Sequence, residues 1–312
     1  MLDLTATILQ RTLVFATPLF LATLGEILTE RAGILNLGME GLIAVGALAA
    51  FVGTAVTGGP WGGLVCAVFA GAALGAVHAF VSVTLRANQV VSGLAITMVG
   101  TGIAGLWGKP FVGTPPLGRL IAVDWPALGL GFLNDIPYIG QIIFSQSPFF
   151  FLSLALGLIL WFLLKHTRWG IRIKSVGENP KAADALGVRV DLVKFACVML
   201  GGSLAALGGA QLALSYSSSW VENMSAGRGW IVIALTIFSL WNPLRAFWGS
   251  LLFGGIFVLQ YLLQPLGVPP SILGMLPYVA TLSVLVLDGF RKDTRSLFAP
   301  AMLGEPYKRG DR

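Results

Sequence analysis

Residues 61–85 read Trp-Gly-Gly-Leu-Val-Cys-Ala-Val-Phe-Ala-Gly-Ala-Ala-Leu-Gly-Ala-Val-His-Ala-Phe-Val-Ser-Val-Thr-Leu and contain no Asp, Glu, Lys or Arg. A helix crosses the hydrocarbon core of a bilayer with about 20 residues, so this stretch is long enough to span a membrane. Lipid offers no hydrogen-bond partners to the backbone, and a helix satisfies its own backbone groups where an open sheet cannot. The stretch therefore predicts a transmembrane helix.

Similar apolar blocks recur along the 312 residues, which are 56% hydrophobic and only 11% charged, with a mean hydropathy of +0.83. Soluble domains carry about a quarter charged residues, so this chain has too few polar side chains to cover a water-facing globule. Windows of about 19 residues place the other candidate spans near 6–27, 34–56, 88–108, 148–164, 194–216, 229–241, 246–264 and 272–288. The block at 229–241 is short for a full span, so it is either a half-helix or part of a span that begins earlier. We predict an all-α integral membrane protein in one domain, 1–312: a polytopic bundle of about 9–10 spans with broken or re-entrant helices.

The distribution of Lys and Arg indicates how the chain is oriented in the membrane. Most of the 20 Lys and Arg lie in a loop at 165–193 and in a tail at 291–312. Cytoplasmic segments carry an excess of such residues, so both segments are predicted to be cytoplasmic. Counting spans outward places Arg31 and the turn at 242–245 on the same side, and leaves the loop at 109–147 outside. The net charge of +6 follows this topology and forms no stripe suited to nucleic acid.

The residues that usually carry chemistry do not converge. Cys66 and Cys197 lie inside apolar segments, where thiols are most often inert packing residues. His78 and His166 have no spacing typical of a metal site. A membrane-embedded enzyme would need a nucleophile with its base, a paired acid and base, or metal ligands, and no such set is evident. We predict no catalytic residues and no metal site.

One polar segment stands between two spans. Residues 177–188 read Gly-Glu-Asn-Pro-Lys-Ala-Ala-Asp-Ala-Leu-Gly-Val. Asn179 can cap a helix whose first position is Pro180, and Gly187 can end it. Isolated helices of about two turns are marginal, so we expect this helix to be stabilised by docking against another surface. The alternative is an ordinary amphipathic connector.

This run resembles the coupling helix of ABC importer permeases, above all the branch of nucleoside and simple-sugar permeases related to ribose and branched-chain amino acid permeases. Residues 30–41, Glu-Arg-Ala-Gly-Ile-Leu-Asn-Leu-Gly-Met-Glu-Gly, are similar to the nucleoside-type form of a second motif. Residues 88–96, Asn-Gln-Val-Val-Ser-Gly-Leu-Ala-Ile, match a polar, Gly-interrupted membrane helix of that branch. The resemblance covers nearly the whole chain, although the turn at 241–245, Trp-Asn-Pro-Leu-Arg, departs from the usual His-Pro-Leu-Gly.

The resemblance implies a permease subunit in a bacterial inner or plasma membrane, with its C-terminus in the cytoplasm. Its implied partners are cytoplasmic ABC ATPase subunits, a second permease that is identical or paralogous, and an extracytoplasmic solute-binding protein. The sequence has no Gly-x-x-x-x-Gly-Lys-Ser/Thr phosphate loop, so we expect the chain to bind no cofactor and the ATPase to use ATP and Mg²⁺. The residues expected to couple to the ATPase are Gly177, Glu178, Asn179, Pro180, Ala182, Ala183, Asp184 and Gly187. The resemblance implies a small polar solute, first a nucleoside, with a simple sugar or a branched-chain amino acid as the alternative.

Polar residues inside the spans are candidates for a translocation path or gate. Glu40 is an intramembrane carboxylate, which is costly in lipid and so a functional candidate. It could brace a broken helix through backbone N–H groups at a half-helix terminus, or bind a polar solute. Trp107 could stack on a solute, or anchor its helix at the membrane surface. The candidates are Asn36, Glu40, Gln89, Ser92, Thr97 and Trp107.

Two predicted external segments have two interpretations each. The Pro-rich loop at 109–147, and the turn that contains Glu222, Asn223 and Arg228, either dock the solute-binding protein or cap the bundle.

A secondary transporter remains an alternative to the ABC permease. It would need its own acidic coupling site near the midplane and would leave the helix at 177–188 unexplained.

Overall fold

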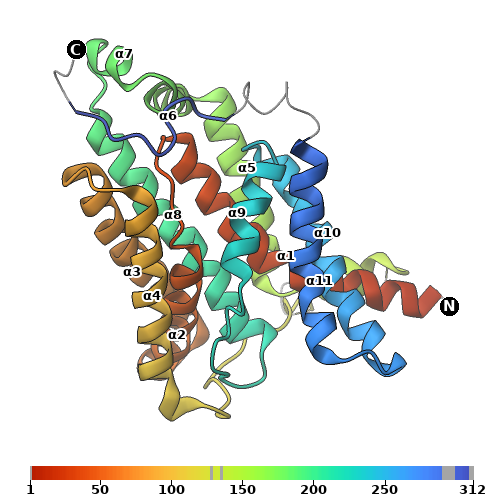
Figure 1. Ribbon diagram of the computed structural model, residues 1–312. Helices are drawn as coiled ribbons and strands as arrows, with labels where there is room; N and C mark the ends of the chain where they lie inside the picture. The colour runs from red at the N-terminus through yellow and green to blue at the C-terminus, as the bar shows by residue number, and fades with distance from the viewer. Residues whose placement is uncertain (1, 127–128, 134–135, 290–298, 309–312) are drawn as a thin grey trace.

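The computed structural model describes residues 2–126, 129–133, 136–289 and 299–308. Within these ranges, seven helices are long and apolar enough to cross a membrane, and two shorter apolar helices lie at Arg228–Phe238 and Ser271–Ser283. The predicted all-α, polytopic membrane protein is confirmed. About 9–10 spans were expected; among the described residues seven helices have the length for a full span, and two of the predicted apolar blocks give shorter helices. Figure 1 shows the bundle, with the first residues of α1 (Leu2–Arg31) at one side of it and α7 (Pro180–Ala185) at another.

The α-helices are α1 (Leu2–Arg31), α2 (Met39–Thr57), α3 (Pro60–Ala79), α4 (Gln89–Gly108), α5 (Pro148–His166), α6 (Arg168–Glu178), α7 (Pro180–Ala185), α8 (Val190–Gln211), α9 (Arg228–Phe238), α10 (Pro243–Leu263) and α11 (Pro270–Gly289). Short 3-10 or π turns are η1 (Phe80–Thr84), η2 (Lys109–Phe111), η3 (Gly131–Leu133), η4 (Gly140–Phe144), η5 (Leu212–Tyr216) and η6 (Gln264–Leu266). The turns η1 and η5 continue α3 and α8 without a break.

The centre of the bundle is formed by α1, α2, α3 and α8, and small residues bring these helices together. A Cβ atom added to Gly71 of α3 would lie 2.3 Å from the carbonyl oxygen of Gly202 in α8. A Cβ added to Gly46 of α2 would lie 2.3 Å from Ala206 of α8. In a membrane, close packing and not hydrophobicity drives helix association, so these glycines set the helix spacing.

Two helix boundaries differ from simple full-length spans. The span expected from residue 34 begins at Met39, because residues 32–38 form a turn and an extended connector in which Gly33 has φ +83°. The predicted half-helix is found: α9 has 11 residues. At 1.5 Å per residue it is about 16 Å long, roughly half the hydrocarbon core. The loop at 217–227 precedes it.

The connecting segments gather at two ends of the bundle. At one end Arg31 donates a hydrogen bond to the carbonyl of Trp241 (3.3 Å), and the backbone of Met302 bonds to Gly177 (2.9 Å). We call this the basic end, made of the connector 32–38, α6 and α7, the turn 239–242 and residues 299–308 (Figure 1). Residues 290–298 and 309–312, where part of the predicted tail falls, lie outside the described residues.

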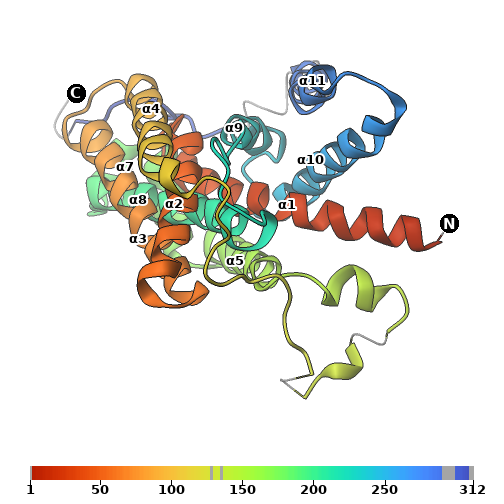
Figure 2. The ribbon, with the colours of Figure 1, turned by 90° about the horizontal axis from the view of Figure 1, so that it is seen from below.

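At the opposite end the two predicted external segments meet. Val112 and Trp220 form an isolated parallel bridge, and Gly113 N–H donates to the Trp220 carbonyl (2.9 Å). Figure 2 shows the connection from α4 to α5 extending beyond the bundle on the side of α5. Leu120 is nevertheless buried, and its N–H bonds to the carbonyl of Leu214 (2.9 Å). The loop therefore has both a packed portion and a projecting portion.

Candidate functional site

The helix α7 forms from local signals at the basic end. The Asn179 side chain accepts a hydrogen bond from the N–H of Ala182 (3.0 Å), and Pro180 occupies the first helical turn. After six helical residues the chain leaves the helix, and Gly187 adopts φ +82°. Glycine is favoured in that left-handed conformation, because the Cβ atom of any other residue would be sterically strained there. The predicted cap, start and end of this helix are confirmed.

The inner face of α7 is anchored by the segment 299–308. Tyr307 donates its hydroxyl hydrogen to Asp184 (3.1 Å), and the N–H of Ala301 donates to the carboxylate of Glu178 (3.2 Å). Ala183 is buried. This anchor was not predicted from the sequence, because its two bonds join residues 123 positions apart. Docking of a short helix was expected, and here part of the docking surface comes from the chain itself.

The outer face of α7 is open. Lys181, Ala182 and Ala185 are exposed, and Leu186 is 85% exposed at the end of the helix. A solvated leucine next to small residues is an apolar surface that a partner can cover. The basic end therefore offers a rigid, capped helix with an uncovered outer face.

Glu40 lies in the first turn of α2 and bonds to the beginning of α9. Its two carboxylate oxygens accept hydrogen bonds from the N–H groups of Gly227 (2.7 Å) and Gly229 (2.6 Å). The first N–H groups of a helix have no partner within the helix, and the helix dipole favours negative charge there. Glu40 is only 5% exposed, so these bonds are shielded from water. This is the geometry of the bracing interpretation: a carboxylate that caps a half-helix.

Arg228 lies beside this contact and is buried. Its guanidinium donates to the carbonyls of Met224 (3.2 Å) and Ser225 (3.1 Å). It also lies over the rings of Phe257 (5.1 Å) and Tyr216 (5.6 Å). The sequence placed Arg228 in an external turn, but the structure places it inside, at the first residue of α9. These partners lie in η5, in the loop before α9 and in α10, and no sequence spacing indicates that arrangement.

The other polar residues predicted for a path or gate surround the connector 32–38. Gln89 accepts a hydrogen bond from the N–H of Leu35 (2.7 Å), and Thr97 donates to the carbonyl of Leu37 (2.8 Å). Asn36 accepts a bond from the N–H two residues further on, at Gly38 (2.9 Å). These side chains thus satisfy the backbone of a non-helical segment inside the bundle.

Ser92 takes part in the same arrangement through a histidine. Its hydroxyl is 2.9 Å from Nδ1 of His78, and Nε2 of His78 is 3.2 Å from the carbonyl oxygen of Leu35. Trp107 lies apart from this group on α4 and is 64% exposed. That position suits a membrane anchor. The structure thus brings Asn36, Gln89, Ser92 and Thr97 together around the connector, and leaves Trp107 and Glu40 elsewhere.

Two cavities open toward the opposite end. One of about 520 Å³ lies between α4, at Met98 and Thr101, and the loop that carries Glu222 and Asn223. The other, of about 530 Å³, lies between α1 and α10. It is lined by apolar, aromatic and polar side chains that include Arg11, Phe15, Tyr216 and Tyr261. Both volumes fall within the range of about 300–1,000 Å³ typical of small-molecule sites.

Comparison with known proteins gives a consistent result. Residues 8–285 match the family described as "Branched-chain amino acid transport system / permease component". The chain is 37% identical over 324 residues to a putative glucose ABC transporter permease protein of Haloferax volcanii, covering 97% of this chain and 98% of the relative. It is 35% identical over 318 residues to the guanosine ABC transporter permease protein of Bacillus subtilis, covering 98% and 97%. It is 34% identical over 291 residues to the nucleoside ABC transporter permease protein of Lactococcus lactis subsp. cremoris, covering 90% and 91%.

Proposed function

The chain belongs to the family of branched-chain amino acid transport system permease components, and we propose that it imports a nucleoside with energy from a separate ATPase. As an ABC transporter permease it is the membrane component of a transporter and not a catalytic enzyme. The observation that carries the proposal is the capped helix α7, presented at the basic end of a bundle whose whole length matches ABC permeases.

We assign α7 the role of the coupling helix. Its outer face, with Ala182, Ala185 and the exposed Leu186, is the surface that docks in the ATPase. Asp184 of α7 and Glu178 at the end of α6 both bond to residues 299–308, so α7 is held against the rest of the protein and can transmit a movement of the ATPase. ATP and Mg²⁺ are used by the ATPase. Among the other residues expected to couple to the ATPase, Asn179, Pro180 and Gly187 define the cap, start and end of α7.

The basic end is assigned to the cytoplasm and the opposite end to the outside of the cell membrane. Support comes from the positive charges of the segment 165–193, which follow the positive-inside rule. The bridge between Val112 and Trp220 joins the two external segments into one surface. That surface is the one we assign to the solute-binding protein. A second permease, identical or paralogous, completes the membrane unit.

The solute is assigned as a nucleoside, on the resemblance of residues 30–41 and 177–188 and on two relatives named for guanosine and nucleosides. The cavity lined by Arg11 and Tyr261 supports this, because the half-exposed Tyr261 ring can stack on a planar base and polar side chains can bind ribose hydroxyls. A simple sugar is the second candidate, favoured by the relative named for glucose at 37% identity.

Uptake of labelled solutes tests the assignment. Cells with and without this gene receive labelled adenosine, glucose or leucine, and each uptake is competed with the unlabelled forms of the other two. We expect gene-dependent adenosine uptake that excess glucose and leucine leave unchanged. Gene-dependent uptake of glucose or leucine without adenosine uptake would overturn the solute assignment and retain the permease.

A further inference from the structure

The connector 32–38 runs from the segment next to α7 to the cavity beside α4. Its backbone is not helical, and its side chains alternate in burial: Ile34 and Asn36 are buried, whereas Leu35 and Leu37 are half-buried. Successive side chains of an extended chain point to opposite faces. The two leucines therefore lie on the outer face of the connector, away from the core of the bundle.

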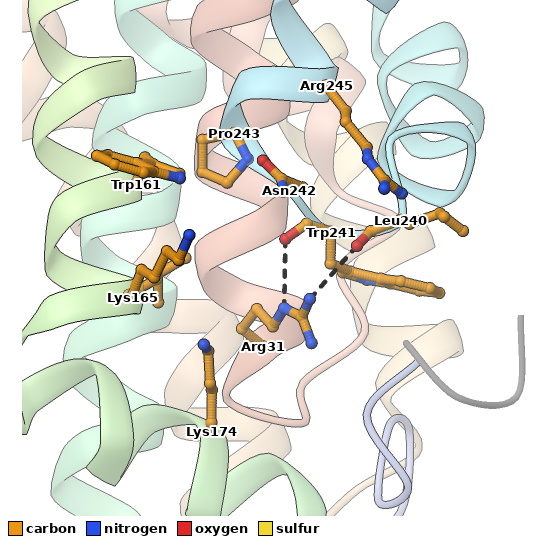
Figure 3. Close-up of a pocket in the computed structure, with 10 residues that line it drawn as sticks. Arg31, Trp161, Lys165, Lys174, Leu240, Trp241, Asn242, Pro243 and Arg245 are labelled. Carbon is orange, nitrogen blue, oxygen red and sulfur yellow. Dashed lines mark hydrogen bonds between the residues drawn. The ribbon is translucent and has the colours of Figure 1, made fainter. Parts of the chain in front are cut away.

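The start of the connector is held at the basic end and touches the segment before α7. Arg31, the last residue of α1, donates from Nε to the carbonyl of Trp241 and from Nη2 to the carbonyl of Leu240, both at 3.3 Å (Figure 3). Gly177 lies in the last turn of α6, immediately before α7. A Cβ atom added to Gly177 would lie 2.3 Å from the carbonyl oxygen of Arg31 and 3.3 Å from the nitrogen of Gly33. A displacement of α7 therefore acts directly on the backbone where the connector begins.

The end of the connector lies deep against α4. The hydroxyl of Thr97 donates to the carbonyl of Leu37 (2.8 Å), and a Cβ atom added to Gly93 would lie 2.6 Å from the nitrogen of Leu37. Thr97 is eight residues after Gln89, the first residue of α4, so this contact is about 12 Å along the span. Irregular backbone at such depth is tolerated where it is buried in protein or lines a water-filled cavity.

The cavity of about 520 Å³ begins where the connector ends. Met98, the residue after Thr97, lines this cavity, and so does Thr101, whose hydroxyl donates to the carbonyl of Thr97 (2.8 Å). The lining residues of α4 continue from there toward the opposite end of the bundle, away from the connector. The connector therefore lies between this cavity and the basic end, and a solute in the cavity meets Leu37 before it reaches the basic end.

Side chains from two helices hold the middle of the connector. Nε2 of the fully buried His78, in α3, lies 3.2 Å from the carbonyl oxygen of Leu35, and Nδ1 lies 2.9 Å from the hydroxyl of Ser92. A neutral imidazole with its hydrogen on Nε2 donates to Leu35 and accepts from Ser92. Gln89 accepts from the N–H of Leu35 (2.7 Å), while its own buried Nε2 has no acceptor among the described residues. Because an unpaired buried donor costs free energy, a second position of the connector that supplies an acceptor is favoured by this group.

We propose that the connector is the cytoplasmic gate of the cavity beside α4, and that His78, Gln89 and Thr97 are positioning residues that hold it closed. Apolar constrictions are effective gates because they exclude water and polar solutes, and Leu35 and Leu37 supply such side chains. A movement of α7 reaches the gate through the contact between α6 and the start of the connector. The inference rests on the proposed assignment of the basic end to the cytoplasm, and it is independent of the identity of the solute.

Access to the cavity from each side of the membrane tests the proposal. The reporter is Gly102→Cys, in a chain that also carries Cys66→Ala and Cys197→Ala, because Gly102 lines the cavity and an added Cβ meets no atom within 4 Å. Inside-out and right-side-out vesicles from cells that make the whole transporter receive a charged, membrane-impermeant thiol reagent without ATP. The variant is Thr97→Val, which keeps the side-chain shape and removes the hydrogen bond to the connector. The matched control is Thr236→Val, a buried threonine of α9 whose hydroxyl bonds within its own helix.

We expect the reporter alone and the Thr236→Val control to be labelled slowly from the cytoplasmic side, in inside-out vesicles. Thr97→Val should be labelled roughly 2- to 12-fold faster from that side, the population shift expected from the loss of one hydrogen bond, with no change from the other side. His78→Leu should act in the same way. His78→Gln should restore slow labelling, because its amide N–H can still donate to the carbonyl of Leu35.

The proposal is overturned if Thr97→Val is labelled like the reporter alone, or if the Thr236→Val control is accelerated as much. It is also overturned if the reporter alone is labelled equally fast from both sides, since the connector would then close nothing. Acceleration seen only in right-side-out vesicles would retain the gate and refute the assignment of the basic end to the cytoplasm. If His78→Leu does not fold, the comparison of the two threonine variants decides.

Discussion

Replacing Glu40 by Gln tests what holds the half-helix α9 in place. The carboxylate of Glu40 accepts bonds from Gly227 (2.7 Å) and Gly229 (2.6 Å). A carboxamide has one acceptor oxygen, so one of these N–H groups loses its partner. A charge-assisted hydrogen bond contributes about 1.5–3 kcal/mol, and negative charge at a helix N-terminus adds roughly 0.3–1 kcal/mol. We expect Glu40→Gln to lower the free energy of unfolding by about 2–4 kcal/mol.

The change is measured as the melting temperature of the purified permease, followed by fluorescence-detected size exclusion after heating. At about 2–4 °C per kcal/mol, the loss corresponds to roughly 4–16 °C. The control is Glu222→Gln, which removes a carboxylate from the exposed loop at the opposite end and should leave the melting temperature unchanged. A Glu40→Gln protein that melts like wild type but takes up solute with a higher apparent KM would refute the bracing argument. It would place Glu40 in contact with the solute instead.

Three further substitutions test neighbouring contacts. Leu186→Asp should abolish uptake and retention of the ATPase in pull-downs without lowering the melting temperature. Leu266→Asp, a matched control at another largely exposed leucine (73%) at the opposite end, should keep the ATPase bound. Retention of the ATPase by both variants would show that α7 is not part of the interface. Gly229→Ala should lower the melting temperature, because its Cβ would lie 2.2 Å from the backbone of Glu40. Gly255→Ala is the control and should leave the melting temperature unchanged, because the nearest neighbour of its Cβ is at 4.0 Å. Equal melting temperatures of the two variants would contradict the close approach of Gly229 to Glu40. Tyr307→Phe should cost about 0.5–1.5 kcal/mol and speed hydrogen exchange in α7, and unchanged exchange would show that the tail does not anchor that helix.

The features that the sequence predicted well depend on neighbours along the chain. The cap at Asn179, the start at Pro180 and the end at Gly187 involve contacts within a few residues, so the residue types alone indicate α7. The half-helix α9 was predicted from the length of its apolar block. The fold class follows from composition, because a helix is the structure that lets an apolar segment satisfy its backbone hydrogen bonds in lipid.

The features that it did not predict depend on residues far apart in the chain. Glu40 and Gly227 are separated by 187 positions, so only the folded bundle shows which helix terminus the carboxylate caps. Gln89 and Thr97 were recognised as polar residues in an apolar span. A polar side chain there can serve a solute or the backbone, and sequence alone does not say which of these it bonds to.

The convergence of basic residues from several helices at the basic end was also not predicted from the sequence. Lys165 and Lys174 were interpreted as markers of membrane orientation, and Arg31 and Arg245 lie in other segments of the chain. Their convergence depends on the packing of α1, α5, α6 and α10.

The central claim is that this chain moves solute with energy from ATP hydrolysed by a partner. The most direct test measures gene-dependent uptake of labelled adenosine after two treatments: a protonophore with ATP maintained, and ATP depletion with the membrane potential maintained. We expect uptake that survives the protonophore and stops on ATP depletion. Uptake that collapses with the protonophore while ATP is intact would identify an ion-coupled transporter. ATP hydrolysis by a partner would then not be the energy source.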